Sequence, residues 1–203
     1  MKYLISSIDD YSEDEICKFL PIIYDSKRKR IEKFVNKTRL KQSVVGEILL
    51  RNLLKTYGIN YSKSFFETNM AQKPYIKNCN VFFNISHSSN YVICVTSENN
   101  VGVDIEKIRK INTNDIKFFA TKNEQNYILS DDKSIYERAF IIYTLKESYY
   151  KLLNCTLDEA KKTEFSIAGD TIICSNNNVK CKLIKDLPNY IIAICEIKNY
   201  TNV

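Results

Sequence analysis

The chain has 203 residues, of which 44% are hydrophobic and 27% charged, a composition that is ordinary for a soluble globular protein of one large domain or two small ones. With only 4 glycines and 3 prolines it contains no flexible linker or low-complexity tail, and no apolar run reaches the about 20 residues of a membrane span. The net charge of +6 favours an anionic partner: nucleic acid, a membrane surface, a nucleotide cofactor or an acidic protein.

The first part of the chain is predicted to form a strand followed by a helix. Residues 1–10 become acidic too early for a signal peptide, and we read them as a strand. Ser12 is followed three residues later by Glu15, which is the capping-box pattern of a helix start. Pro21 interrupts this helix, because proline does not continue a helical hydrogen-bond ladder.

Two further helices are predicted between Asp25 and Gly58. Asp25 is expected to cap a helix that carries the basic run 27–30 and ends near Val35. A longer helix is expected over about residues 38–57, with Gly58 as its C-cap. The inward face of that helix would carry Val44, Val45, Ile48, Leu49 and Leu53.

Strand-like segments follow in the middle of the chain. We expect a short strand at Phe65–Glu67, a turn-like segment at Asn69–Tyr75 and a strand at Tyr91–Thr96, the last from its β-branched residues. Residues 101–106 alternate aliphatic residues with glycine and two carboxylates. This period of two predicts a strand that buries the aliphatic side chains and places both carboxylates on its opposite face.

The last hundred residues are predicted to contain helices and then strands. Thr121 and Glu124 form a second capping-box pattern, and Asp131 or Asp132 is expected to cap a long helix that ends near Leu153. Strands are expected at Glu164–Ile167, continuing through Thr171–Cys174, and then at Val179–Ile184 and Tyr190–Ile197.

A weak internal repeat relates the two parts of the chain. In each, a helix that ends in paired leucines leads to strands that finish with Asn-Tyr and an apolar run, at residues 90–95 and 189–195. The sequence therefore predicts an α+β fold of two similar halves, residues 1–100 and 101–203, each with a helix packed on a small antiparallel sheet. We expect a ligand to bind in the cleft between the halves.

The polar side chains of this second half form a candidate metal site. Asp104 and Glu106 lie on one face of the predicted strand, and Glu147 and Lys151 lie on one face of the predicted long helix. Carboxylates that meet in space beside a lysine make a site for a hard cation, and Mg²⁺ is usually held by a few carboxylates together with substrate phosphates. Each segment alone is also typical of a solvated strand face or of surface helix pairing.

Read together, these two segments resemble the signature of the Sfp-type 4′-phosphopantetheinyl transferases. Gly-Val-Asp-Ile-Glu stands at 102–106, and Thr-Leu-Lys-Glu-Ser-Tyr-Tyr-Lys at 144–151. The basic run at 27–30, Lys-Pro-Tyr at 73–75, Asn-Ile-Ser-His-Ser at 84–88 and residues 119–124 resemble further family motifs. The resemblance implies a two-half fold and transfer of the phosphopantetheine arm of coenzyme A to a serine of an acyl or peptidyl carrier protein, with Mg²⁺ and release of adenosine 3′,5′-bisphosphate.

The resemblance also implies roles for single residues. Glu147 is the preferred general base, with Glu124 or a metal-bound water as alternatives, and Lys151 would stabilise the transferred phosphoryl group. The implied Mg²⁺ ligands are Asp104, Glu106 and Glu147. The implied contacts to coenzyme A are Lys27, Arg28, Arg30, Lys73, Ser86, His87, Asp104 and Lys151.

Some residues depart from the family pattern or have a plain alternative. Gln72 stands where the family has glycine, and Phe119 and Glu124 are five residues apart rather than four. Glu124 is therefore equally well explained as part of a capping box. His87, the single histidine, could be a core residue, but the flanking serines favour a phosphate contact.

Two other classes of function remain open from the residues. Clustered carboxylates and basic residues also occur in Mg²⁺-dependent phosphoesterases and nucleases, and the basic run alone would suit a non-enzymatic binder of nucleic acid or an acidic protein. Seven cysteines without a Cys-x-x-Cys pair predict reduced, buried thiols in a cytoplasmic protein. We expect a monomer that acts on carrier proteins and coenzyme A, without nucleic acid or membrane; the pathway it serves is not encoded in these motifs.

Overall fold

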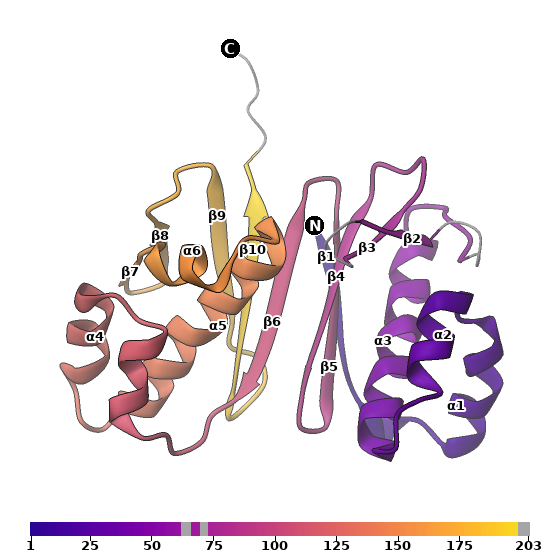
Figure 1. The fold of residues 1–203 in the computed structure, drawn as a ribbon, viewed down its shortest axis with the longest axis horizontal. Coiled ribbons are helices and arrows are strands. Elements are labelled where there is room, and N and C mark those ends of the chain that lie inside the picture. Colours follow the sequence, from indigo (N-terminus) through magenta and orange to yellow (C-terminus); the bar gives the residue numbers. More distant parts are fainter. Residues whose placement is uncertain (62–65, 70–72, 199–203) are drawn as a thin grey trace, which may run out of the picture. The chain divides into compact units, whose positions relative to one another are not determined.

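The computed structural model describes residues 1–61, 66–69 and 73–198 (Figure 1). The chain divides into two compact units, unit 1 at Met1–Glu98 and unit 2 at Asn99–Val203. Phe65 of the predicted short strand and residues 70–72 of the predicted turn-like segment, Gln72 among them, lie outside the described residues. No helix in the described ranges is long and apolar enough to span a membrane.

Unit 1 is a three-stranded antiparallel sheet with helices packed on it. The sheet order is β1-β5-β4, and a separate two-stranded sheet pairs β2 with β3. The long helix α3 lies against β1, β4 and β5. The elements are β1 (Lys2–Ser7), η1 (Ile8–Asp10), α1 (Glu13–Phe19), η2 (Leu20–Ile22), α2 (Asp25–Ile31), α3 (Lys37–Lys55), β2 (Phe66–Thr68), β3 (Pro74–Ile76), β4 (Phe82–Ser88) and β5 (Tyr91–Ser97).

Unit 2 repeats this arrangement. Its three-stranded antiparallel sheet has the order β6-β10-β9, its small second sheet pairs β7 with β8, and its long helix α5 lies against β6 and β10. The elements are β6 (Val101–Lys107), η4 (Thr113–Phe118), α4 (Lys122–Leu129), α5 (Ile135–Leu153), α6 (Leu157–Lys162), β7 (Phe165–Ala168), β8 (Thr171–Cys174), β9 (Val179–Ile184) and β10 (Tyr190–Ile197).

The two units therefore share one chain path. In each, an edge strand leads through short helices to a long helix, then to a two-stranded sheet, a second edge strand and finally the central strand. The central strands β5 and β10 both begin with tyrosine after an asparagine. The predicted α+β fold with two similar halves is confirmed, while the predicted cleft between the halves stays a prediction.

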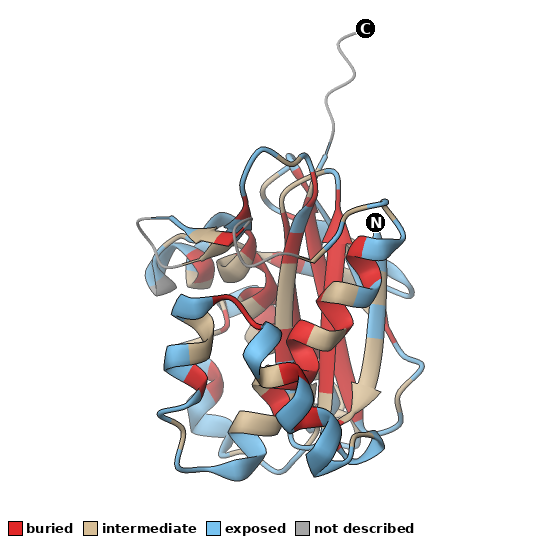
Figure 2. Cartoon of the chain, turned by 90° about the vertical axis from the view of Figure 1, so that its right-hand side faces the viewer, coloured by how far each residue is buried: buried red, intermediate tan, exposed pale blue. Residues whose placement is uncertain are grey.

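Apolar residues on one face of each long helix form the two cores. In α3, Val44, Val45, Leu49 and Leu53 are buried as predicted, and Ile48 is partly buried against them. Figure 2 shows buried residues gathered on the strands and on the helix sides that face them, with exposed residues on the outer helix faces. Each unit therefore has a hydrophobic core of its own between helix and sheet.

Both predicted capping boxes are confirmed. The Ser12 side chain accepts a hydrogen bond from the Glu15 backbone N–H, and the Glu15 carboxylate accepts one from the Ser12 backbone N–H. Thr121 and Glu124 make the same reciprocal pair at the start of α4. These residues satisfy backbone N–H groups that have no partner inside the first helical turn.

The prediction for α2 is wrong at both ends. Asp25 is the first residue of the helix and Tyr24 is its N-cap, because the Asp25 carboxylate forms an ion pair with Arg28 at 2.9 Å instead of a cap. The helix ends at Ile31, and Val35 lies beyond it with its side chain exposed.

Two further predicted helix ends are wrong. Thr56 is the C-cap of α3, while Gly58 follows in a turn with φ of 69°. Ser134 precedes α5 as its N-cap, and Asp131 instead accepts the Ser134 hydroxyl hydrogen bond at 2.8 Å. Asp132 is not a cap either. The aspartates thus shape the turn before the helix rather than its first turn.

The final strands match the prediction closely, with a few elements that the sequence pattern did not reveal. β8, β9 and β10 have the predicted bounds, and β7 begins one residue later than expected. The 3-10 helices, β3 and α6 were not predicted, since each is too short to show periodicity. All seven cysteines are free thiols. The prediction that they are buried is confirmed for Cys94, Cys174 and Cys195 and is wrong for Cys17, which is exposed.

Candidate functional site

The strand β6 and the helix α5 approach each other closely at Gly102. A Cβ atom at this position would lie 2.1 Å from the Ser148 backbone oxygen and 2.5 Å from the Leu152 backbone nitrogen. Only glycine leaves room for the helix backbone at this point, since the neighbouring atoms are backbone and do not move aside. The close approach places the last turns of α5 over the strand face that carries Asp104 and Glu106.

Ser148 holds this contact in register and was missed by the sequence analysis. Its hydroxyl donates to the Gly102 backbone oxygen at 2.9 Å and accepts from the Cys195 backbone N–H at 2.9 Å. Gly102 and Cys195 face each other in the β6–β10 pair, so one side chain joins the helix to two strands. The sequence feature that could have indicated this role is the position of Ser148, a small polar residue on the apolar side of the predicted helix.

The predicted alternation in β6 is confirmed, and the carboxylate face meets α5. Val101, Val103 and Ile105 are fully buried on one side of the strand. On the other side, Lys151 donates to Asp104 Oδ1 at 2.6 Å, and the Asp104 side chain is only 6% exposed. A salt bridge this short and this buried holds the α5 lysine over the strand.

Glu147 lies one helical turn before Lys151 and interacts with both strand carboxylates. Burial raises the pKa of Glu147, and the negative charges of Asp104 and Glu106 raise it further, while Lys151 lowers it. Glu106 in turn forms an ion pair with Arg109 at 3.2 Å. The structure therefore brings Asp104, Glu106, Glu147 and Lys151 into one electrostatically coupled group, as the sequence predicted.

This group has the chemistry of a Mg²⁺ site. Its oxygen donors are the ligands that a hard divalent cation prefers, and the repulsion among them would be relieved by such a cation. Within the described ranges, however, no three His, Cys, Asp or Glu side chains are already arranged around one metal position. Lys151 and Arg109 neutralise Asp104 and Glu106 instead, so a bound cation would have to share or replace these ion pairs.

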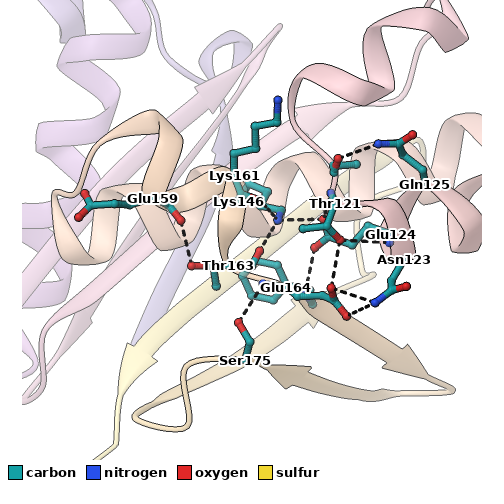
Figure 3. Close-up of polar contacts among 12 residues, drawn as sticks. Thr121, Asn123, Glu124, Gln125, Lys146, Glu159, Lys161, Thr163, Glu164 and Ser175 are labelled. Atoms are coloured by element: carbon teal, nitrogen blue, oxygen red, sulfur yellow. Dashed lines mark hydrogen bonds and ion pairs between the residues drawn. The ribbon is translucent and has the colours of Figure 1, made fainter.

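Glu124 lies apart from this group, in a buried network that Figure 3 displays. Its side chain forms an ion pair with Lys146 at 2.8 Å and accepts hydrogen bonds from the Thr121 and Phe165 backbone N–H groups at 2.7 and 2.9 Å. Lys146 also donates to the backbone oxygens of Lys161 and Thr163. The Glu124 side chain is 0% exposed, so its observed role is to join α4, α5 and β7.

An apolar cavity of about 490 Å³ opens beside Glu147. Its lining includes aromatic side chains from the segment around η4 and from α5, and burial raises the pKa of one of them, Tyr143, to about 12. The volume falls in the range of small-molecule pockets. The principal lining residues are Phe118, Phe119, Phe140, Tyr143, Lys146 and Glu147.

Unit 1 contains a separate cavity of about 280 Å³ with a cationic lining. Lys27 and Arg30 reach it from α2, Arg39 from the start of α3, and His87 from β4. Three of these residues were predicted as phosphate contacts, and Arg39 was not. Basic side chains that converge in this way suit the binding of an anion.

Lys27 connects this cavity to a buried acid on α3. Its ammonium group lies 3.7 Å from Glu47, which is 1% exposed and accepts a hydrogen bond from the Tyr61 hydroxyl at 2.9 Å. Burial lowers the pKa of Lys27 and raises the pKa of Glu47. Glu47 therefore pairs with one of the basic side chains that line the cavity, while Arg30 and Arg39 line it as well.

The other predicted coenzyme contacts are placed elsewhere. Arg28 forms ion pairs with Asp25 and Glu32 on its own helix and does not line the cavity. Ser86 is buried on the face of β4 opposite to that of its neighbour His87, since successive residues of a strand alternate. Lys73 lies outside this cavity, and burial lowers its pKa to about 8.

Comparison with known proteins identifies the family to which the chain belongs. Residues 10–99 match the family model described as 4′-phosphopantetheinyl transferase, N-terminal. Residues 100–195 match the model of the 4′-phosphopantetheinyl transferase superfamily. The two models meet at the boundary between unit 1 and unit 2. The chain belongs to the 4′-phosphopantetheinyl transferase superfamily.

Individual relatives confirm the Sfp-type resemblance. The 4′-phosphopantetheinyl transferase Sfp of Bacillus subtilis (strain 168) is 32% identical over 143 residues, which is 69% of this chain and 64% of that protein. The transferase gsp of Aneurinibacillus migulanus is 32% identical over 129 residues, or 63% of this chain and 54% of that one. The match thus spans less than two thirds of either relative. A crystal structure of Thermotoga maritima holo-[acyl-carrier-protein] synthase shares 16% identity, with a TM-score of 0.42 over 49% of this chain and 63% of that one.

Proposed function

We propose that this chain transfers the 4′-phosphopantetheine arm of coenzyme A to a serine of an apo acyl or peptidyl carrier protein, in a Mg²⁺-dependent reaction. Membership of the superfamily supports the reaction class. The observation that carries the proposal is the placement of Glu147 and Lys151 over Asp104 by the close approach at Gly102. Side chains of α5 and β6, which are far apart in the sequence, thereby lie next to one another.

Mg²⁺ would be held by Asp104, Glu106 and Glu147, where it would neutralise charge on the pyrophosphate of coenzyme A. The chain's own residues supply the other functions. Lys151 is positioned to stabilise charge on the transferred phosphoryl group. The carrier serine must lose a proton as it attacks, and Glu147 is the preferred base because burial and the neighbouring carboxylates raise its pKa and make it a stronger proton acceptor.

Glu124 is a weaker choice for the base. Its two oxygens already accept hydrogen bonds from backbone N–H groups and meet the ammonium of Lys146. Both oxygens are thus engaged by groups of the protein itself, and the side chain is 0% exposed, so a carrier serine cannot reach it without breaking these contacts. We assign Glu124 a positioning role through Lys146, the residue directly before Glu147 in α5.

Coenzyme A offers features that suit both cavities. Its phosphates are multiply charged, and the unit 1 cavity presents Arg30, Arg39 and His87 to an anion. Its pantetheine arm is a narrow chain of alkyl and amide groups, which matches the volume and the aromatic wall of the cavity beside Glu147. We therefore assign the 3′-phosphate of coenzyme A to the cationic cavity of unit 1, and its pyrophosphate and arm to the acidic group and the apolar cavity of unit 2.

The finer features of the function follow from charge and composition. We propose that the protein acts as a cytoplasmic monomer, without nucleic acid or membrane, and that its carrier proteins are acidic. The net charge of +6 would then accelerate encounter with the carrier protein. Transfer rates measured at low and high ionic strength should differ, with the slower rate at high salt; equal rates would contradict an electrostatic contribution to encounter.

The test of the function is intact-mass spectrometry of an apo carrier protein. We expect incubation with this protein, coenzyme A and Mg²⁺ to add the mass of one phosphopantetheine arm, and EDTA to prevent the addition. Unchanged mass on several unrelated carrier proteins, combined with no coenzyme A binding by calorimetry, would contradict the proposal. Release of phosphate without any gain in carrier mass would favour a Mg²⁺-dependent phosphoesterase instead.

A further inference from the structure

Three cysteines of unit 2 lie side by side and have no part in the proposed transfer reaction. Cys181 of β9 faces Cys195 of β10 in the strand register, and their Sγ atoms are 3.0 Å apart. Cys181 also shares a side-chain hydrogen bond with Cys174 of β8. Cys174 and Cys195 are buried, whereas Cys181 is partly exposed. Cys181 is therefore the thiol of this cluster that a dissolved reagent can reach.

The geometry of the facing pair suits a disulfide. Directly opposite residues of an antiparallel pair have Cβ atoms about 4.5–5.5 Å apart, and a disulfide needs a sulfur separation of about 2.05 Å with Cβ atoms about 3.5–4.5 Å apart. Cys181 and Cys195 thus need an approach of about 1 Å and no change of register. No three His, Cys, Asp or Glu side chains in the described ranges are arranged to hold a metal ion, so thiol oxidation is the chemistry that this cluster supports.

We propose that Cys181 and Cys195 form a reversible cross-strand disulfide on exposure to hydrogen peroxide, and that this modification acts on the strand that carries Asp104. The Cys181 sulfur attacks one peroxide oxygen, the O–O bond breaks, and the departing oxygen leaves as water with the thiol proton. Cys181 is left as a sulfenic acid. The Cys195 sulfur then attacks the Cys181 sulfur and forms the disulfide bond. The hydroxyl group of the sulfenic acid leaves as a second water with the Cys195 proton. Two thiols lose two electrons, and peroxide is reduced to two waters.

The modification reaches the candidate site through two hydrogen bonds. The backbone N–H of Cys195 donates to the Ser148 hydroxyl, and that hydroxyl donates to the backbone oxygen of Gly102. Gly102 lies two residues before Asp104 on β6, and Ser148 is adjacent to Glu147 on α5. A displacement of Cys195 toward Cys181 would therefore shift Ser148, the residue that holds α5 against β6. This second part of the inference rests on the proposed transferase function.

The disulfide itself is tested without reference to activity. The protein is treated with hydrogen peroxide, its remaining thiols are alkylated under denaturing conditions, and the products are analysed by intact mass and peptide mapping. We expect two of the seven thiols to escape alkylation and a cross-linked pair of peptides that contain Cys181 and Cys195. Dithiothreitol should restore alkylation of all seven. Full alkylation after peroxide, or a cross-link at another pair, would overturn the proposal.

Matched variants separate the pair from its neighbours. Cys181→Ser should abolish the loss of two thiols, whereas Cys17→Ser and Cys174→Ser should retain it. Loss of the cross-link in Cys174→Ser would show that Cys174 is one of the two partners and would overturn the assigned pair. Since the peptide map of the unaltered chain needs no variant, a folding defect in one variant leaves the test intact.

The effect on the site is measured on the same samples. We expect oxidation to reduce the rate of carrier-protein loading, with about a hundredfold as the upper bound for a displacement of about 1 Å, and dithiothreitol to reverse the loss. Cys181→Ser should keep its rate after peroxide. A mapped disulfide with an unchanged loading rate would overturn the coupling to the site, and absence of any loading before oxidation would instead count against the proposed function.

Discussion

The two units share a chain path but carry opposite charges at one equivalent position of the long helix. Glu47 in α3 and Lys146 in α5 lie the same number of residues before Tyr91 and Tyr190, the tyrosines that begin the central strands. Both are buried and both form an ion pair with a shorter helix: Glu47 with Lys27 of α2, and Lys146 with Glu124 of α4. The sign of the pair is reversed between the units.

This reversal changes the charges that lie beside each long helix. In unit 1 the helix supplies the acidic residue of the pair, and Arg30 and Arg39 also line the cavity beside it. In unit 2 the helix supplies the basic residue of the pair, Lys146, which neutralises Glu124. The acidic residue next to Lys146 in the sequence is Glu147. Under the proposed function, the two halves share one topology but would bind different groups, a phosphate ester in unit 1 and a cation in unit 2.

The largest expected effect comes from removing one partner of a buried pair. Glu124→Gln leaves Lys146 charged and buried, and we expect the free energy of unfolding to fall by about 3–5 kcal/mol. Glu47→Gln should have a smaller effect, since its pair is longer, 3.7 Å against 2.8 Å, and Lys27 is 16% exposed. Urea denaturation of both variants measures the difference. An equal loss would contradict the comparison between the units.

The second prediction distinguishes two neighbouring arginines of α2. Arg30 lines the cationic cavity, so Arg30→Ala should weaken coenzyme A binding by about 10- to 100-fold, the value of a hydrogen bond to a charged group. Arg28→Ala is the matched control, because Arg28 is occupied by Asp25 and Glu32 and should leave the affinity nearly unchanged. Isothermal calorimetry gives both affinities. Equal losses for the two variants would mean that the cavity is not the phosphate site.

The third prediction compares a glycine from each unit. Gly102→Ala should lower the free energy of unfolding by about 1–3 kcal/mol, because its Cβ would meet backbone atoms. Gly46→Ala should be milder: the close atom at 2.8 Å is the side-chain Cγ2 of Ile85, and alanine favours the helix by about 1 kcal/mol. Thermal denaturation checks both. If Gly46→Ala lost as much free energy of unfolding as Gly102→Ala, the backbone contact between β6 and α5 at Gly102 would not be the cause of the loss.

The smallest expected effect concerns Lys73 and pH. Burial lowers its pKa to about 8, so the lysine is charged below that pH and becomes neutral as the pH rises through it. If Lys73 meets a coenzyme phosphate, affinity should fall about tenfold between about pH 7 and pH 9. Lys73→Arg should remove this dependence, because arginine stays protonated throughout. A pH dependence that persists in Lys73→Arg would assign it to another group.

Local patterns in the sequence predicted much of the fold and the acidic site. The alternation at 101–106 predicted the buried and polar faces of β6, and the spacing of Glu147 and Lys151 placed both on one side of α5. The capping boxes at Ser12 and Thr121 also follow from residues only three apart. These features depend on contacts within a few residues, which a sequence pattern records directly.

Features that depend on packing between distant segments could not be predicted in the same way. Nothing in the run 27–30 tells which arginine faces a cavity, since that is set by the rotation of α2 against its neighbours. The roles of Gly102 and Ser148 require the register of α5 on β6, and the pairing of Glu124 with Lys146 requires two helices to meet. Such contacts exist only in the folded chain.

The central claim is that the acidic group of unit 2 supports transfer, and Asp104→Asn tests it most directly. This variant keeps the shape of the side chain but removes its charge, whereas Asp170→Asn removes an equal charge from a 96% exposed side chain on the surface of the same unit. We predict that Asp104→Asn slows Mg²⁺-dependent loading of a carrier protein by at least about a hundredfold, with Asp170→Asn at the unaltered rate. Equal loading rates for the two variants would contradict the account.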